Sequence, residues 1–220
     1  MEMLAQNAKD GWKRPIYFAV TVGNDYYLGL NPYFELTGLA YRVTPERSRD
    51  GRERVNVEKM YDNMMHKFAY GNMNIPGIYI DENLMRMCRT HRMMFMQLAE
   101  ALYYNGEPEK VREVLDYSEQ MLPGYNIPYD YTSASMATLY YQLGTDEDIE
   151  KANAIMTKVA ENCVEYLRWG DSLGKQQRKA AQQVLGHQQA VLGFVLQNLE
   201  RRQQRDLLNQ YYPIYREYAQ

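Results

Sequence analysis

The stretch that decides the fold is FMQLAEALYYNGEPEKVREVLDYSEQMLP, at residues 95–123. Apolar and small residues recur in it at helical spacing on both sides of Gly106, where a helix would end. The spacing predicts one helix over about 83–104 and another over about 107–121. Two antiparallel helices pack closely only where a small residue stands at their crossing, and Ala99 occupies that place.

A second copy of this pattern follows. Ala137 repeats the role of Ala99 at a separation of 38 residues, Gly144 repeats the role of Gly106, and Ala152 is the small residue of the next helix. The spacing matches the tetratricopeptide repeat, although that repeat is usually about 34 residues long. The matching positions are Phe95, Leu98, Ala99, Leu102, Val111, Leu115, Ser118 and Pro123 in the first copy, and Met136, Ala137, Tyr140, Ala152, Met156 and Val159 in the second. The alternative is a generic helical bundle with coincidental spacing.

The pattern continues as helix to the end of the chain. Because one helix pair cannot bury its apolar face alone, its neighbours must stack on it. Apolar periodicity predicts four further helices, over about 129–143, 147–168, 175–206 and 205–218, with Pro213 as the position where the last could bend.

The first eighty residues have a different sequence pattern from the helical region that follows. IYFAVTV (16–22) and GLAYRVTP (38–45) are rich in β-branched and aromatic residues, so we expect two paired strands. NPYFELT (31–37) has the residues of a helix start. A Met-rich helix over 57–70 is expected to pack on the sheet. The charged segment 46–54 is interpreted as an exposed loop, with an anion site as the alternative.

These elements predict an α+β protein that is mainly α. A small subdomain with a short β-sheet is expected over 1–82, followed by a tetratricopeptide-like helical-repeat region over 83–220. Composition adds limits: the formal net charge is −3, which gives no general attraction to nucleic acid. No apolar run reaches the roughly 18–20 residues that span a bilayer. The two cysteines, Cys88 and Cys163, fall at apolar helical positions and are interpreted as buried free thiols.

Catalytic patterns are missing from the sequence. It contains no HExxH, GxSxG, CxxC or Gly-rich phosphate loop. Asp62 and His66 are four residues apart and are interpreted as a surface pair. Glu35 and Asp62 are two carboxylates that nothing in the sequence brings together. The residues therefore indicate no catalytic site, no metal site and no cofactor, and whether the protein takes part in an enzyme stays open.

Four stretches carry a resemblance to a known family: GWKRPIYFA (11–19), YLGLNPYFELTGLAYRVTP (27–45), MYDNMMHKFAYGNM (60–73) and IYIDEN (78–83). With Asn7, they resemble the C-terminal soluble region of a Bacteroidetes family of multi-pass membrane proteins of unknown function. That family is similar to protein O-mannosyltransferases. The resemblance implies a membrane-spanning region upstream, a place at the periplasmic face of the inner membrane, and a parent protein that transfers sugar from a lipid-linked donor. It supplies no catalytic residue for this chain.

Two functions are therefore open. One is a non-catalytic periplasmic accessory domain that binds acceptor polypeptide or a protein partner of the membrane enzyme. The other is a free-standing helical-repeat scaffold for protein assembly. Because tyrosine combines a large apolar ring with a polar tip, tyrosines are the candidate groove residues. They are Tyr103, Tyr104, Tyr129, Tyr131 and Tyr141; Tyr140 occupies a packing position and is expected in the core.

Overall fold

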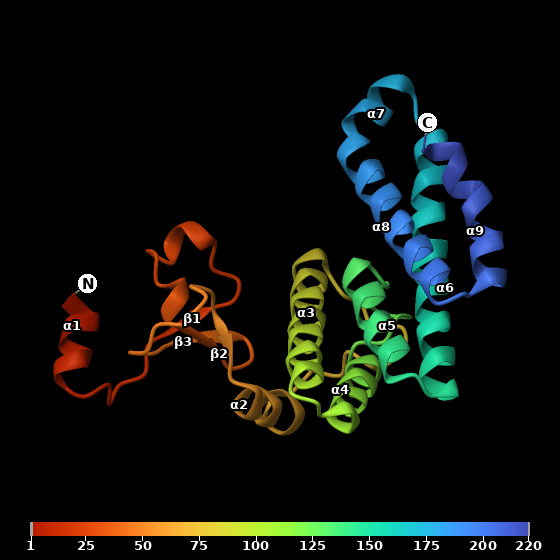
Figure 1. The fold of residues 1–220 in the computed structure, drawn as a ribbon. Coiled ribbons are helices and arrows are strands. Elements are labelled where there is room, and N and C mark those ends of the chain that lie inside the picture. Colours follow the sequence, from red (N-terminus) through yellow and green to blue (C-terminus); the bar gives the residue numbers. More distant parts are fainter. Residues whose placement is uncertain (1, 220) are drawn as a thin grey trace. The chain divides into compact units, whose positions relative to one another are not determined.

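A computed structural model describes residues 2–219 (Figure 1). They form two compact units. The first unit runs up to Asn72 and also contains Arg86–Tyr117; the second contains Met73–Met85 and the described chain from Ser118 onward. The protein is mainly helical with a small sheet near the N-terminus, which confirms the predicted fold class. The boundary between 82 and 83 stays a prediction, since the compact units divide the chain at other places.

The sheet of the first unit has four short strands in the order β1-β3-β2-β4. Their bounds are Tyr17–Ala19 for β1, Phe34–Leu36 for β2, Ala40–Val43 for β3 and Arg54–Val55 for β4. β3 pairs antiparallel with both β1 and β2, whereas β2 and β4 are parallel. Phe18 stands opposite Tyr41, so the predicted pairing of the two β-prone segments is confirmed.

The expected helix start at 31–37 is wrong beyond its first turn. Asn31–Tyr33 forms a single 3-10 turn with Pro32 near its start, and the chain then enters β2. Phe34 and Leu36 are buried while the residue between them is half-buried, which is the two-residue period of a strand. Burial of these two side chains therefore overrides the local helix signal.

Four aromatic rings form the core on one face of the sheet. Phe34 is completely buried, and its ring centroid lies 5.2 Å from Phe18, 5.0 Å from Tyr27 and 5.2 Å from Tyr41. The Tyr27 and Phe34 rings meet edge to face, and the Phe34 and Tyr41 rings are stacked. These geometries add to the stabilisation that comes from burying the rings.

The Met-rich segment begins as predicted but ends earlier. α2 spans Val57–Asp62, with the Asn56 side chain accepting a hydrogen bond from the backbone N–H of Lys59. A π-helical turn, Asn63–Lys67, follows in place of the rest of the predicted helix. The Asn63 amide donates to the Thr37 carbonyl at 2.7 Å. This bond ties the π turn to the connection between β2 and β3.

The rest of the first unit contains α1 (Glu2–Lys9) and most of a helical hairpin made by α3 (Glu82–Tyr104) and α4 (Pro108–Met121). Gly106 has a positive φ between the two helices, as the turn signal predicts. The Tyr70 ring packs against Phe95 and edge-on to Tyr117, with ring centroids 5.6 Å and 5.9 Å away. Tyr61 donates to the Glu113 carboxylate at 2.5 Å. These contacts attach the hairpin to the segment that follows the sheet.

The second unit is a helical array. Its helices are α5 (Tyr131–Leu143), α6 (Asp146–Asp171), α7 (Lys175–Ala180), α8 (Gln182–Arg201) and α9 (Arg205–Tyr218). α6 packs against α5 and α8, and α9 packs against α8 (Figure 1). Side chains of Asp130 and Thr145 cap α5 and α6, and Gly144 ends α5 in the left-handed conformation. The caps explain why these two boundaries were predicted closely.

The predicted helix over 175–206 is wrong as a single element. It is divided into α7 and α8 at Ala181, and α8 ends at Arg201. All six side chains of α7 are exposed, so no buried face holds this turn in line with α8. Gln203 has a positive φ and turns the chain into α9, which continues through Pro213. The repeat positions Ala99, Ala137 and Ala152 are all buried, but tetratricopeptide packing stays a prediction.

Candidate functional site

The structure divides the five candidate tyrosines between the two units. Tyr103 and Tyr104 lie on α3 in the first unit, with ring centroids 6.0 Å apart; Tyr104 is 84% exposed. Tyr129, Tyr131 and Tyr141 belong to the second unit. The five residues are therefore not members of one surface within either unit, and their role in binding stays a prediction.

Tyr141 is part of the interior of the second unit. It is 4% exposed, and its hydroxyl donates to Asn153 Oδ1 at 2.6 Å. The Arg202 guanidinium carbon lies 5.8 Å from the centre of its ring. Burial raises the pKa of Tyr141 to about 12. Tyr141 therefore holds α5, α6 and the end of α8 together, and Tyr140, which is also buried, confirms the expectation that it is a core residue.

Tyr131 is half exposed and packs against α8. Its ring centroid lies 4.9 Å from that of Phe194. The two rings are tilted by 53° to one another, and about half of the Tyr131 surface stays in solvent.

Tyr129 lines the largest cavity described in the second unit, of about 820 Å³. One wall is the connection between α4 and α5, and the other is a face of α6. The lining residues are Pro123, Gly124, Tyr125, Pro128 and Tyr129 from the connection, and Ala154, Ile155, Thr157, Lys158 and Asn162 from α6. The volume is in the range of small-ligand and peptide side-chain sites.

Hydrogen bonds hold the connection in place on both sides. The Tyr129 hydroxyl donates to the Glu119 carboxylate, and the Asn162 amide donates to the Tyr129 carbonyl at 3.0 Å. The Tyr125 hydroxyl donates to the Asn74 carbonyl at 2.6 Å. The Asn126 amide donates to the carbonyls of Met73 and Ile75. The cavity wall is therefore preformed, although it is built from loop residues.

The lining of the cavity is mainly aromatic, proline and aliphatic, with two neutral polar side chains, Thr157 and Asn162, and one cation, Lys158. Lys158 pairs with Glu161 at 2.7 Å, and both side chains are near half exposure. Such a lining suits an extended apolar chain that needs few charged partners. Sequence reasoning found Tyr129 but missed Tyr125 and Pro128. The dense Pro, Gly and Tyr content of LPGYNIPY (122–129) was the available signal.

Gly124 gives a direct test of this wall. A Cβ added at Gly124 would lie 2.5–2.6 Å from two ring atoms of Tyr129, which is closer than contact distance allows. We expect Gly124→Ala to push the Tyr129 ring away from Glu119 and to lower the free energy of unfolding by about 1–3 kcal/mol. Chemical denaturation measures the cost. Gly174→Ala is the control, since a Cβ there meets only the end of the Gln177 side chain at 3.5 Å; equal costs for the two variants would contradict the close packing at Tyr129.

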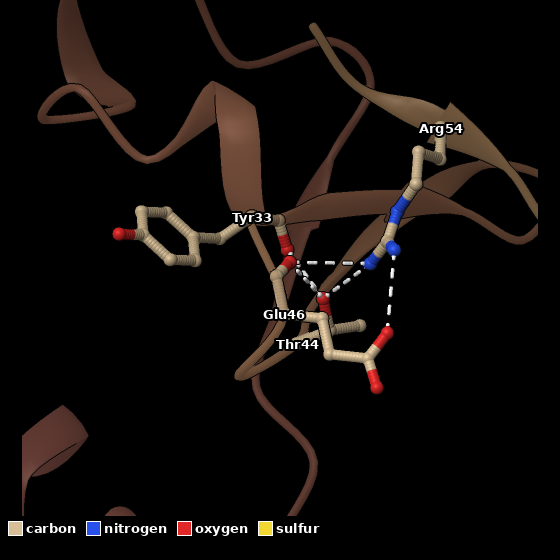
Figure 2. Close-up of polar contacts among 4 residues, drawn as sticks. All are labelled: Tyr33, Thr44, Glu46 and Arg54. Atoms are coloured by element: carbon tan, nitrogen blue, oxygen red, sulfur yellow. Dashed lines mark hydrogen bonds and ion pairs between the residues drawn. The ribbon is translucent and has the colours of Figure 1, made fainter. Parts of the chain in front are cut away.

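The Arg-rich segment 46–54 contains an internal polar network rather than an open anion site at Arg54. Figure 2 shows the Arg54 guanidinium turned toward Thr44 and Glu46. It donates to Thr44 Oγ1 at 2.9 Å and to the Glu46 carbonyl at 3.2 Å, and its other nitrogen lies 3.5 Å from Glu46 Oε2. The Thr44 hydroxyl lies 3.1 Å from the Tyr33 carbonyl. Arg54 thus fastens β4 to the chain that follows β3.

The carboxylates of Glu35 and Asp62 both lie beside cationic residues. Glu35 is opposite Arg42 and Arg54 in the strand register, and Asp62 forms an ion pair with Lys67. The His66 ring lies edge-on to Tyr61, 5.7 Å between centroids. Within residues 2–219 no group of three or more His, Cys, Asp or Glu side chains is arranged to hold a metal ion. None of the helices described is both long and apolar enough to cross a membrane.

Comparison with known proteins gives one family match. A family model described as TMEM260-associated domain 2 matches residues 1–60. The match covers a little over a quarter of the chain and includes the whole sheet. It fits a family of TMEM260-like membrane proteins. No curated protein and no solved structure matches the chain.

Proposed function

We propose that this chain is a non-catalytic accessory domain of a membrane protein related to the protein O-mannosyltransferases, and that it binds acceptor polypeptide or a protein partner. The match of residues 1–60 to a TMEM260-associated domain carries the first half of this proposal. The sheet and its aromatic core lie wholly within that match. On this proposal the chain lies at the periplasmic face of the inner membrane, attached to a membrane-spanning region upstream, and uses no cofactor.

Polypeptide binding is the second half, and the cavity beside Tyr129 supports it. Grooves lined by aromatic rings accept extended, proline-containing peptides because such peptides lose little conformational entropy on binding. Tyr125 is 63% exposed and stands at the cavity with its hydroxyl already bonded to a carbonyl, so its ring is fixed. The stacked helices around it are proposed to be tetratricopeptide-like.

Peptide display against the whole chain tests the binding half. We expect extended sequences with proline and apolar residues to be enriched, and Tyr125→Ala or Ala154→Trp to weaken a selected peptide by about tenfold. Ala154 is exposed at the cavity, so tryptophan there fills it without entering the core. Tyr79→Ala is the control, because Tyr79 is exposed in the same unit and does not line the cavity. Equal affinity for all variants would place binding elsewhere.

Cell fractionation tests the membrane half. An antibody to this chain is expected to detect a band much larger than 26.0 kDa in the inner-membrane fraction of the source cells. A band near 26.0 kDa outside the membrane fraction would instead favour the free-standing scaffold. The two experiments can fail separately, since peptide binding does not require membrane attachment.

A further inference from the structure

A second cavity, of about 460 Å³, lies at the end of the second unit where α6, α7, α8 and α9 meet. α7 contributes three cations, Lys175, Arg178 and Lys179. α8 contributes Gln182 and Gln189, and α9 contributes Tyr218. Leu167 and Leu185 supply apolar surface. The cavity is separate from the one that Tyr129 lines, and no residue belongs to both.

The charge at this cavity is opposite to that of the chain. Residues 172–199 contain three cationic side chains and no Asp or Glu, although the whole chain has a formal net charge of −3. All three cations lie on one six-residue helix that is exposed along its length. Cations gathered at a concave surface raise the local concentration of anions.

One acidic residue at the margin organises the cluster. Asp171, at the end of α6, lies 3.2 Å from the Arg178 guanidinium and accepts a hydrogen bond from the Tyr218 hydroxyl at 2.6 Å. These contacts join α6, α7 and α9 and orient the guanidinium. Two of the three positive charges, on Lys175 and Lys179, remain in excess over Asp171. The opposite charges of Arg168 and Glu217, which both act on Tyr218, leave that excess unchanged.

We propose that this cavity binds the phosphate group of a phosphorylated ligand. An excess of two positive charges matches a phosphate monoester or a diphosphate better than a single carboxylate. The Arg178 fork and the two lysine ammonium groups are donors that suit phosphate oxygens, and Gln182 and Gln189 add neutral polar groups. Leu167 and Leu185 give the rest of the ligand an apolar surface. This site is independent of the proposed peptide-binding function.

Titration with inorganic phosphate and pyrophosphate at constant ionic strength tests the proposal, with backbone amide shifts of α7 as the readout. We expect saturable shifts, and an affinity about tenfold or more weaker in the Lys175→Gln/Arg178→Gln/Lys179→Gln variant. The control is Lys9→Gln/Lys13→Gln/Arg14→Gln, which removes the same charge from exposed positions of the first unit. The control variant should bind as the unchanged protein does.

A second arm separates a soluble ligand from a lipid headgroup. Vesicles of phosphatidylcholine with and without phosphatidic acid are sedimented with the protein. Binding only to the phosphatidic acid vesicles, lost in the α7 variant, would assign the phosphate group to a lipid. The proposal is overturned if phosphate, pyrophosphate and phosphatidic acid all fail to bind saturably, or if the control variant loses binding as much as the α7 variant does. Thermal unfolding is measured to check that both variants are folded.

Discussion

Replacing Phe34 with alanine is expected to lower the free energy of unfolding of the first unit by about 3–5 kcal/mol. The Phe34 side chain is 0% exposed and touches three other rings, so its removal leaves a cavity that the short strands cannot close. Because the free energy of unfolding of a domain is only about 5–15 kcal/mol, the expected loss is a large share of it. Denaturant unfolding, followed by the reactivity of Cys88 in the same unit, measures the loss.

Tyr26→Ala is the matched control for this experiment. Tyr26 lies in the same first unit as Phe34 and carries an aromatic ring of similar size, but Tyr26 is 72% exposed. Its removal is expected to change the free energy of unfolding by no more than about 0.5 kcal/mol. If the two variants lost equal stability, the aromatic cluster would not be the core of the region that matches the TMEM260-associated domain.

The long helices could be predicted because their signals agree at every level. In α3 and α5, apolar periodicity agrees with an end signal at Gly106 or Gly144 and with the burial of small residues, and α6 begins just after Gly144. The break at Ala181 could not be predicted, since neither Gly nor Pro marks it. It arises because α7 has no buried face, and only the tertiary structure decides which polar turns find a packing partner.

The candidate site was predicted only in part, again because the tertiary structure decides which side chains are buried. The chemistry of tyrosine made Tyr129 and Tyr141 equal candidates, because the local sequence around each one fits either a groove position or a core position. The structure buries Tyr141 under Arg202 and leaves Tyr129 beside a cavity. The phosphate-binding proposal rests on charges of α7 that the sequence shows, but the partners that orient them come from α6 and α9. Asp171 is close to Arg178 in the sequence, but Tyr218 of α9 is distant, so spacing alone could not bring α9 to this cavity.

The buried thiol of Cys163 gives the second large effect. In the folded protein, Cys163 is expected to react with a disulfide reagent at pH 8 about a thousandfold more slowly than in the unfolded chain. The side chain on α6 is 1% exposed, and burial raises the pKa of its thiol to about 12 from an ordinary value of 9.0. Because only the thiolate reacts, the raised pKa and the lack of access act in the same direction.

The pH dependence of the labelling rate distinguishes a raised thiol pKa from restricted access alone. With a raised pKa the folded protein keeps the proton, so the labelling rate should rise about tenfold per pH unit above pH 9, where an ordinary thiol levels off. Because the pKa of Cys163 is higher in the folded state, its thiol stabilises the folded state below pH 9. This contribution to stability is lost as the pH rises toward about 12. Cys88→Ser leaves Cys163 as the single thiol, and labelling is followed with and without denaturant. Rapid labelling of the folded variant at pH 8 would contradict the packing of α6 against α5 and α8, on which the Tyr129 cavity also depends.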